Sequence, residues 1–332
     1  MKKLIILFII GLGFASCSEV IVNDEINYID TGVDPDQWVK VPAGTFYSGM
    51  HSHVDTVNYD YEIMVTDVTN KQYAEFMNKA VAAQKIKIEG DSIKGHYKGD
   101  KFDGYLHEWK IPEGDYLLMP FGAPGSHIKL VDNKFVVDKG FENHPVVMVT
   151  WFGAKAYADF YGYRITTEKE WQKAARGTDK RAFPWGDEID GSIANYGSAD
   201  KSELKKLFNC KIVRTTPVGF YNGKKYGNFQ TRDNRSPYGL YDMGGNVWQW
   251  VGDDYPKVHY RYMRGGSFEN YEYNLFVWAR NSAGPDFYEI NIGFRCSRDP
   301  QKEEVKEQPE AQEEAQTEQE KEKEKEQESE KE

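Results

Sequence analysis

The spacing of apolar residues changes period several times along the chain. Strand formers flank a turn at 41–46, and residues 61–65 (YEIMV) are mostly apolar with one charged residue, which predicts a half-buried strand. After 69–70, apolar residues recur three and four positions apart, which is the spacing of one helix face. Thr69 and Asn70 are residue types that cap helices. The first part of the chain therefore predicts short strands followed by an amphipathic helix.

Two further helices are predicted in a denser apolar block. The segment 151–161 reads as a buried helix that ends at Gly162. Thr167 and Glu170 have the spacing of a capping box, so a second helix begins after Thr167 and ends at Gly177. Beyond them, residues 236–300 are rich in Gly, Trp and Asn and show little periodicity. We expect this long aromatic segment to be irregular but held by specific hydrogen bonds.

The segment 84–143 differs in amino-acid composition from the rest of the body. It is rich in Gly, Lys and Asp, and Asp132 and Asn133 separate two strand-like runs, which predicts a hairpin. The segment lacks an apolar set large enough for its own core. We therefore interpret it as an insertion in one domain that covers 39–299.

Charge is unevenly distributed over the 332 residues. The formal net charge is −11, and 14 Glu against 6 Lys give residues 301–332 a charge of −8, so the body is nearly neutral. A body without a basic surface excess is not typical of a nucleic-acid-binding protein, and we expect no nucleic-acid partner. The tail at 300–332 has too few apolar residues to form a core, and we expect it to be disordered.

The first residues have the pattern of an export signal. Lys2 and Lys3 precede an apolar run at 4–14 that is too short to span roughly 30 Å of hydrocarbon. Phe14, two small residues and Cys17 follow, which resembles the lipobox of bacterial lipoproteins, with Phe14 where Leu is usual. This predicts a signal peptide at 1–16, a diacylated Cys17 (palmitate) and a polar linker at 17–38. Ordinary signal cleavage that leaves Cys17 as a thiol is the alternative.

The two remaining cysteines leave alternatives open. Cys210 and Cys296 can pair in an oxidising compartment, but the sequence does not place them within bonding distance. The sequence holds no Cys-x-x-Cys pair and no zinc-ligand spacing. His51 and His53 form the closest histidine pair, and we interpret it as a loop feature.

A series of ordered motifs resembles the formylglycine-generating-enzyme (sulfatase-modifying factor) family. The motifs lie at 41–49, 65–76, 144–151, 164–177 (RITTEKEWQKAARG), 183–186, 216–218, 236–250 (SPYGLYDMGGNVWQW), 264–267 (RGGS) and 292–296 (IGFRC). They cover about 38–298. The resemblance implies an α+β fold of the C-type-lectin-like type with little regular secondary structure.

The resemblance also implies a chemistry that this chain lacks the residues to perform. Active members oxidise a substrate cysteine with two cysteines that bind copper(I) just after the Arg-Gly-Gly-Ser motif, because Cu(I) prefers soft thiolates. The corresponding stretch here, 268–280, contains no cysteine. Cys296 matches a position that is usually structural in the family. We therefore expect no formylglycine generation and no copper site.

The family's calcium sites are partly matched. Asn195 and Tyr196 resemble the entry to one site, and Asn246 and Val247 resemble the second. In the second site the family usually supplies a glutamate, where this chain has Gln249, so we expect a weakened Ca²⁺ site. The alternative for Asn246 is a left-handed turn residue whose amide is bonded to backbone.

A candidate pocket is predicted around the Arg-Gly-Gly-Ser motif. Its polar and aromatic residues are Trp248, Arg264, Ser267, Glu269, Glu272, Trp278, Arg280 and Asn281. A carboxylate in an aromatic pocket can act as an acid or base. The two arginines can equally tie loops together through bidentate bonds, which is the interpretation we favour.

Three classes of function follow from these features. The first is a non-catalytic outer-membrane lipoprotein, a pseudoenzyme, that binds a protein partner in an envelope assembly. It is similar to the gliding-motility and secretion lipoproteins of Bacteroidetes. The second is a periplasmic or surface oxidase-like enzyme of the same family that acts without the cysteine pair. The third is a carbohydrate-binding module, supported only by the abundance of aromatic residues.

Overall fold

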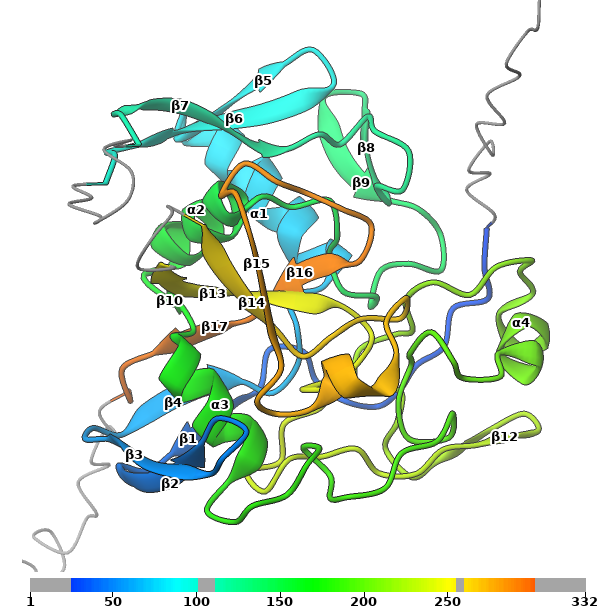
Figure 1. Ribbon diagram of the computed structural model, residues 1–332. Coiled ribbons are helices and arrows are strands. Elements are labelled where there is room, and N and C mark those ends of the chain that lie inside the picture. The colour runs from blue at the N-terminus through cyan, green and yellow to red at the C-terminus, as the bar shows by residue number, and fades with distance from the viewer. Residues whose placement is uncertain (1–24, 101–110, 255–259, 302–332) are drawn as a thin grey trace, which may run out of the picture. The chain divides into compact units, whose positions relative to one another are not determined.

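The computed structural model describes residues 25–100, 111–254 and 260–301. Helices are few and short in this part of the chain (Figure 1). They are α1 (Asn70–Ala82), α2 (Trp151–Tyr161), α3 (Glu168–Arg176), α4 (Ser202–Phe208) and the 3-10 helix η1 (Glu272–Leu275). Among these described helices, none is long and apolar enough to cross a bilayer. Residues 1–24, including the predicted signal and Cys17, and the tail from 302 lie outside the described residues.

Two four-stranded sheets form the centre of the body. In the first, all neighbours are antiparallel, in the order β1 (Trp38–Val41), β4 (Tyr61–Met64), β17 (Cys296–Arg298), β10 (Arg164–Ile165). In the second, the order is β15 (Arg280–Ala283), β14 (Arg261–Arg264), β13 (Trp248–Asp254), β16 (Ile292–Phe294). Its β13 and β16 are parallel and its other pairs antiparallel.

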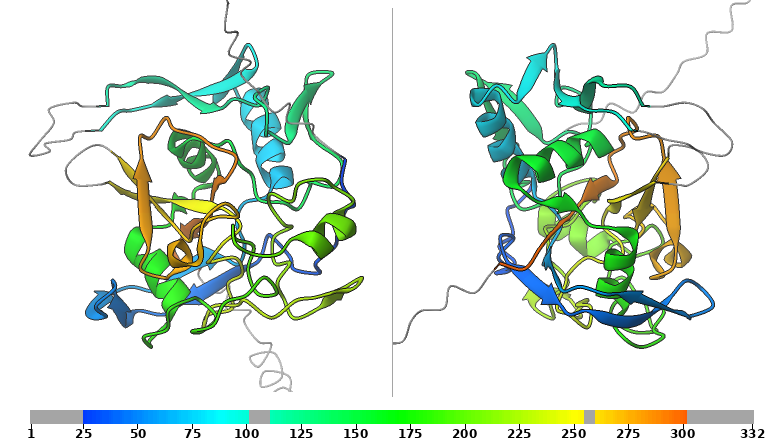
Figure 2. Two further views of the ribbon diagram at one scale, coloured as in Figure 1. Left: turned by 45° about the vertical axis from the view of Figure 1, so that its right-hand side comes forward. Right: turned by 90° about the vertical axis from the view of Figure 1, so that its left-hand side faces the viewer.

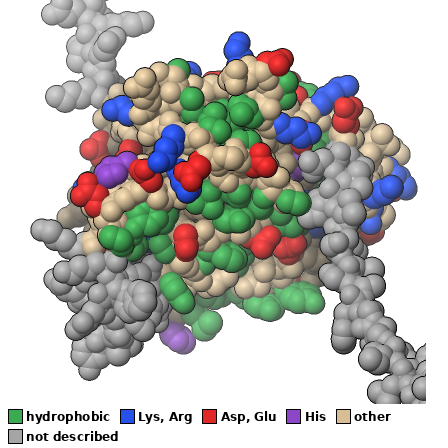
Figure 3. Space-filling model, turned by 90° about the horizontal axis from the view of Figure 1, so that it is seen from above, with side chains coloured by type: hydrophobic (Ala, Val, Ile, Leu, Met, Phe, Trp, Pro, Cys, Tyr) green, Lys and Arg blue, Asp and Glu red, His purple; other side chains and the backbone are tan. Residues whose placement is uncertain are grey.

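Smaller sheets surround this centre (Figures 1 and 2). One has three strands, β5 (Ile86–Glu89), β6 (Ser92–Tyr97) and β7 (Gly114–Met119). The others are the hairpins β2 (Gly44–Ser48) with β3 (His53–Val57), β8 (Ile128–Val131) with β9 (Lys134–Val137), and β11 (Lys225–Tyr226) with β12 (Phe229–Gln230). The face above β5 to β7 shows hydrophobic side chains in its middle, with charged side chains around them (Figure 3).

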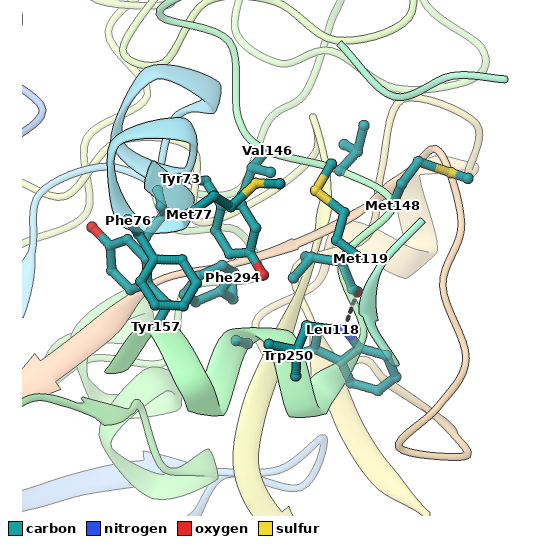
Figure 4. Packing of buried hydrophobic residues seen from close by; sticks show 14 of the residues in the cluster. Tyr73, Phe76, Met77, Leu118, Met119, Val146, Met148, Tyr157, Trp250 and Phe294 are labelled. Carbon is teal, nitrogen blue, oxygen red and sulfur yellow. Dashed lines mark hydrogen bonds between the residues drawn. The ribbon is translucent and has the colours of Figure 1, made fainter. Parts of the chain in front are cut away.

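The largest buried cluster lies where α1 and α2 meet the second sheet. Tyr73 stacks on Tyr157 with ring centroids 5.9 Å apart, and Phe294 of β16 meets both rings edge-on (Figure 4). Trp250 of β13 is fully buried and donates its indole N–H to the Val149 carbonyl at 3.0 Å. Each such aromatic side chain removes 150–250 Å² or so from water, and the irregular segments are thereby held on a rigid core.

The local sequence signals for helices and turns are confirmed. Thr69 and Thr167 cap α1 and α3, both in capping boxes, and α2 ends at Gly162 with φ 72°. Asp132 and Asn133 have φ of 48° and 59°, the conformation of a two-residue hairpin turn between β8 and β9. These features depend on neighbours within four residues, so the sequence alone was sufficient.

The structure corrects one expectation and decides one alternative that the sequence left open. Residues 25–38, expected to be a solvated linker, lie on the body: Ile26 is buried, and Thr31 donates its hydroxyl to the Val218 carbonyl at 3.0 Å. Polar residues here make backbone bonds rather than remaining in water. The sequence left open whether Cys210 and Cys296 pair, and in the structure both are free thiols that belong to different clusters.

The segment 84–143 contributes to the main core. Its buried apolar residues belong to the same cluster as α1 and α2; they are Ile86, Ile93, Leu118, Met119, Phe121, Ile128 and Phe135. Residues 101–110 of this segment lie outside the described residues.

Candidate functional site

A cleft of about 360 Å³ opens between the β2–β3 hairpin, α3 and the edge of the second sheet. Charged and polar side chains line most of it. The lining residues are Ser48, Gly49, Met50, Asp55, Glu168, Lys169, Gln172, Arg264, Trp278 and Arg280. Segments far apart in the sequence therefore meet at one site.

Polar side chains of α3 fix one wall of the cleft. Gln172 accepts a hydrogen bond from the Gly49 N–H at 2.6 Å, and Lys173 donates to the Gly44 carbonyl at 3.2 Å. Arg176 donates to the Gly49 carbonyl at 2.9 Å. All three side chains are buried. Because each satisfies backbone groups of the hairpin, the helix and the hairpin form one rigid unit.

A single carboxylate joins two arginines on the other wall. Glu168 accepts hydrogen bonds from Arg264 and, at 3.3 Å, from Arg280. Arg264 also donates to the Ala279 carbonyl at 3.0 Å. The Arg264 side chain is 2% exposed, and burial lowers its pKa, whereas Arg280 is 52% exposed. Guanidinium groups nevertheless stay charged in proteins, so the cleft holds two cations that share one anion.

The aromatic wall of the cleft is covered on its ring faces. Phe276 stacks on Trp278 with centroids 4.7 Å apart, and the Arg176 guanidinium lies 5.3 Å from the centre of the same ring. Trp278 is half-buried. Phe276 and the Arg176 guanidinium therefore both occupy the ring of Trp278.

Three residues of the predicted pocket, Arg264, Trp278 and Arg280, line this cleft. The predicted loop-tying role of the two arginines agrees with the bonds to Glu168 and Ala279. Glu168 and Gln172 were missed as site residues. Their positions in a capped helix gave no signal that Glu168 meets Arg264, 96 residues later, or that Gln172 meets Gly49, 123 residues earlier.

The other predicted pocket residues lie elsewhere. Trp248 is buried in the main core. Ser267 donates to the Asn270 side chain at 2.6 Å, and Glu269 accepts from Asn291 at 2.6 Å. Asn281 is exposed on β15. None of these four residues lines the cleft.

Glu272 also lies away from the cleft. It is exposed in η1, where its carboxylate approaches the Ser198 hydroxyl at 3.4 Å. Neither of the predicted carboxylates, Glu269 and Glu272, therefore lines the cleft with Trp278.

The described residues do not fit a copper(I) site. No cysteine lies in 268–280, and Cys296 is fully buried in the main core, where burial raises the pKa of its thiol far above the usual range. Cys210 belongs to a different cluster around α4. Cu(I) needs converging thiolates, and these two sulfur atoms do not converge.

The residues around Asn246 do not fit calcium. Asn246 has φ 62°, and its amide exchanges two hydrogen bonds with the Thr216 backbone, at 2.9 and 3.1 Å. The Gln249 side-chain oxygen accepts from Trp171 at 2.6 Å and from Arg295 at 2.9 Å. Val247 is buried core. Side-chain oxygens that already accept N–H donors are poor ligands for a cation, and the positive φ and backbone bonds of Asn246 agree with a left-handed turn residue.

The set at Asn195 and Tyr196 remains a prediction. Asn195 is buried and its side-chain oxygen has no hydrogen-bond partner, while its amide nitrogen donates to the Arg214 carbonyl at 2.7 Å. Tyr196 packs in a small aromatic cluster with Phe183. Within the described ranges no group of three His, Cys, Asp or Glu gathers, so this oxygen has no acidic co-ligands.

Solved structures of similar fold include CarF, with a TM-score of 0.49 and 22% identity over 80% of this chain and 98% of that chain. PvdO from Pseudomonas aeruginosa gives a TM-score of 0.47 and 19% identity over 79% and 94% of the two chains.

Curated relatives include both named enzymes and a protein named as inactive. The formylglycine-generating enzyme of Thermomonospora curvata is 33% identical, with 79% of this chain and 93% of that protein covered. The mouse protein named inactive C-alpha-formylglycine-generating enzyme 2 is 28% identical, with 71% and 74% covered.

Other relatives are much longer proteins. The serine/threonine-protein kinase pkn1 of Chlamydia pneumoniae is 32% identical over 71% of this chain, but the match spans only 38% of the kinase. Two further Chlamydia kinases are matched over 27% of their length. The model of the sulfatase-modifying factor enzyme 1-like domain matches residues 29–300. The chain therefore belongs to the sulfatase-modifying factor enzyme 1-like family.

Proposed function

We propose that this protein is a non-catalytic member of its family that holds a protein partner at the cell envelope. One observation carries the proposal. The chain has three cysteines, and the two that the structure describes lie in separate hydrophobic clusters. Copper-dependent oxidation requires a converging thiolate pair, which these two do not form.

The state of Cys296 supports the same conclusion. Its side chain is fully buried, and burial raises its pKa, so it stays a protonated thiol at neutral pH. The thiolate is the form that binds metals and attacks substrates. The existence of a mouse relative whose name marks it as inactive is consistent with a scaffold that has lost catalysis.

The first test is the oxidation reaction itself. A sulfatase-type peptide with a central cysteine is incubated with the purified protein, with and without copper, and analysed by mass spectrometry. We expect no conversion of cysteine to formylglycine. The Thermomonospora curvata enzyme, as positive control, should convert the same peptide. Conversion by this protein would overturn the non-catalytic proposal and favour an enzyme that works without the cysteine pair.

The envelope location depends on the lipobox-like sequence that ends at Cys17. A diacyl chain adds about 0.8 kcal/mol per buried CH₂, and two chains give stable membrane anchoring. We expect Cys17→Ser to move the protein from the membrane to the soluble fraction, as measured by fractionation and immunoblot. Cys210→Ser is the matched control and should stay in the membrane. If Cys17→Ser fractionates like the wild type, the anchor lies elsewhere.

A partner is sought by crosslinking in intact cells, followed by isolation from detergent-solubilised membranes. A scaffold should be recovered with one envelope protein at constant stoichiometry, and the complex should survive the Cys210→Ser substitution. Recovery of the protein alone with a small molecule bound would instead favour an enzyme.

A further inference from the structure

The cleft beside α3 carries an excess of positive charge. Lys169 forms an ion pair with Asp55 at 2.9 Å. Glu168 is therefore the lining carboxylate that pairs with both Arg264 and Arg280. Five ionic side chains thus line the cleft, three of them cations. One positive charge has no lining carboxylate of its own, and that charge favours an anionic ligand.

Arg280 is the cation that a ligand can reach. Its side chain is 52% exposed, and its contact with Glu168 is long, at 3.3 Å. Its guanidinium lies 4.8 Å from the centre of the Tyr262 ring, which holds the planar group in place. A guanidinium has five N–H donors in a fork that matches a carboxylate. The Arg280 guanidinium is therefore held in position and has N–H groups available to bind a carboxylate.

The surroundings of Arg280 favour an extended peptide. Arg280 begins β15, which is the edge strand of its sheet, and an edge strand can pair with an added strand. Met50, at the hairpin tip beside the cleft, is 66% exposed and offers an apolar contact. A sugar ring needs a free aromatic face, whereas Phe276 and Arg176 already lie over Trp278.

We infer that the cleft binds an extended acidic segment of a protein partner, whose carboxylate is held by Arg280 while its backbone lies along β15. Charge complementarity selects the acidic side chain, and the strand edge supplies the backbone bonds. The rigid α3–hairpin unit keeps the opposite wall in place. The inference rests on the proposed function and names the chemistry of the partner.

Binding is measured by fluorescence anisotropy with the full chain and a labelled peptide of alternating glutamate and valine. This sequence places all glutamates on one side of an added strand. A peptide of alternating glutamine and valine is the uncharged control. We expect the acidic peptide to bind more tightly than its control and to lose affinity as salt is added.

Arg280→Gln is expected to weaken binding of the acidic peptide about tenfold, which is the effect of losing one charge-assisted hydrogen-bond pair. Arg235→Gln is the matched control, because Arg235 is equally exposed at 52%, also pairs with a carboxylate (that of Asp233) and also lies over a tyrosine ring. Arg235 does not line the cleft. The control should bind like the wild type.

Glu168→Gln provides a gain-of-affinity test. The substitution removes the carboxylate that competes for both arginines, so the acidic peptide should bind roughly threefold or more tightly. Thermal unfolding checks that the variant is folded, and added peptide should raise its melting temperature more than that of the wild type. No gain in a folded Glu168→Gln protein would count against the inference.

Three outcomes would overturn the inference. They are equal affinity for the glutamine peptide, equal weakening by Arg235→Gln, and competition by free glutarate that is as strong as competition by the peptide. The last would mean that a small dicarboxylate suffices without a peptide backbone along β15. None of these outcomes shows formylglycine formation, so failure here is distinguishable from failure of the non-catalytic proposal.

Discussion

Arg295→Met should destabilise the protein by about 3–5 kcal/mol at pH 8, the cost typical of breaking a buried ion pair from one side. The Arg295 side chain is fully buried and lies 3.1 Å from the Asp67 carboxylate. It also donates to the Gln249 side chain at 2.9 Å and to the Tyr241 carbonyl at 2.8 Å. Methionine fills the volume but leaves these acceptors without donors. Urea denaturation measures the free energy of unfolding.

The control for this prediction is Arg298→Met. Arg298 lies three residues later, is 21% exposed, and pairs with Glu62 at 2.6 Å. Because its carboxylate partner can reach water, we expect a loss of at most about 2 kcal/mol. The double variant Asp67→Asn/Arg295→Met should recover part of the stability by removing the unpaired buried charge. Equal losses for the two arginine variants would contradict the argument.

The same prediction carries a pH dependence. Burial outweighs the neighbouring Arg295 and raises the pKa of Asp67 to about 7. An acid whose pKa is higher in the folded state binds more protons when folded, so its contribution to stability falls as pH rises from about 4 to 7. Asp67 is mostly protonated at pH 5. The loss caused by Arg295→Met should therefore be smaller at pH 5 than at pH 8.

A second large effect is expected at His144. Its ring is fully buried, with Nδ1 2.8 Å from the Thr215 hydroxyl, and Nε2 has no hydrogen-bond partner. Burial, with a smaller effect of nearby His127, holds the pKa of His144 well below its ordinary value of 6.5. The unfolded chain takes up a proton below pH 6.5, whereas the folded one does not. His144 should therefore cost the protein about 2 kcal/mol of stability between pH 7 and pH 5.

The double variant His144→Phe/Thr215→Val tests this value. It keeps a ring between Phe141 and Phe208, whose centroids lie 5.0 and 6.0 Å from that of His144, and it removes the hydroxyl partner. The drop in unfolding free energy from pH 7 to pH 5 should shrink by about 2 kcal/mol relative to wild type. Thr215→Val alone, which keeps the imidazole, should retain the wild-type slope. Both proteins retain Asp67, so its opposite pH effect cancels in the comparison.

The sequence predicted those features that depend on near neighbours. Thr69 and Thr167 cap their helices, and Asp132 and Asn133 form the hairpin turn, because each signal acts within a few residues. The resemblance added the family and therefore the fold. What it could not give was the position of each side chain in an irregular segment, as the exposed position of Asn281 on β15 illustrates.

The candidate site depended on contacts between distant segments. On α3, the apolar residues Trp171 and Ala174 predicted one buried face, yet Gln172, Lys173 and Arg176 are buried as well. Their partners are backbone groups of a hairpin more than 120 residues earlier. Polar residues that are buried by such long-range bonds look like surface residues in a periodicity analysis.

The position of β17 constrains the order in which the protein can mature. This strand, Cys296–Arg298, lies between β4 and β10, and its neighbour β4 pairs with β1 at the start of the domain. The first sheet can therefore close only when nearly the whole domain has been synthesised. Pairings between such distant segments are slow to form. As the chain is made from its N-terminus, β4 therefore stays without this partner until the last strand of the domain is synthesised.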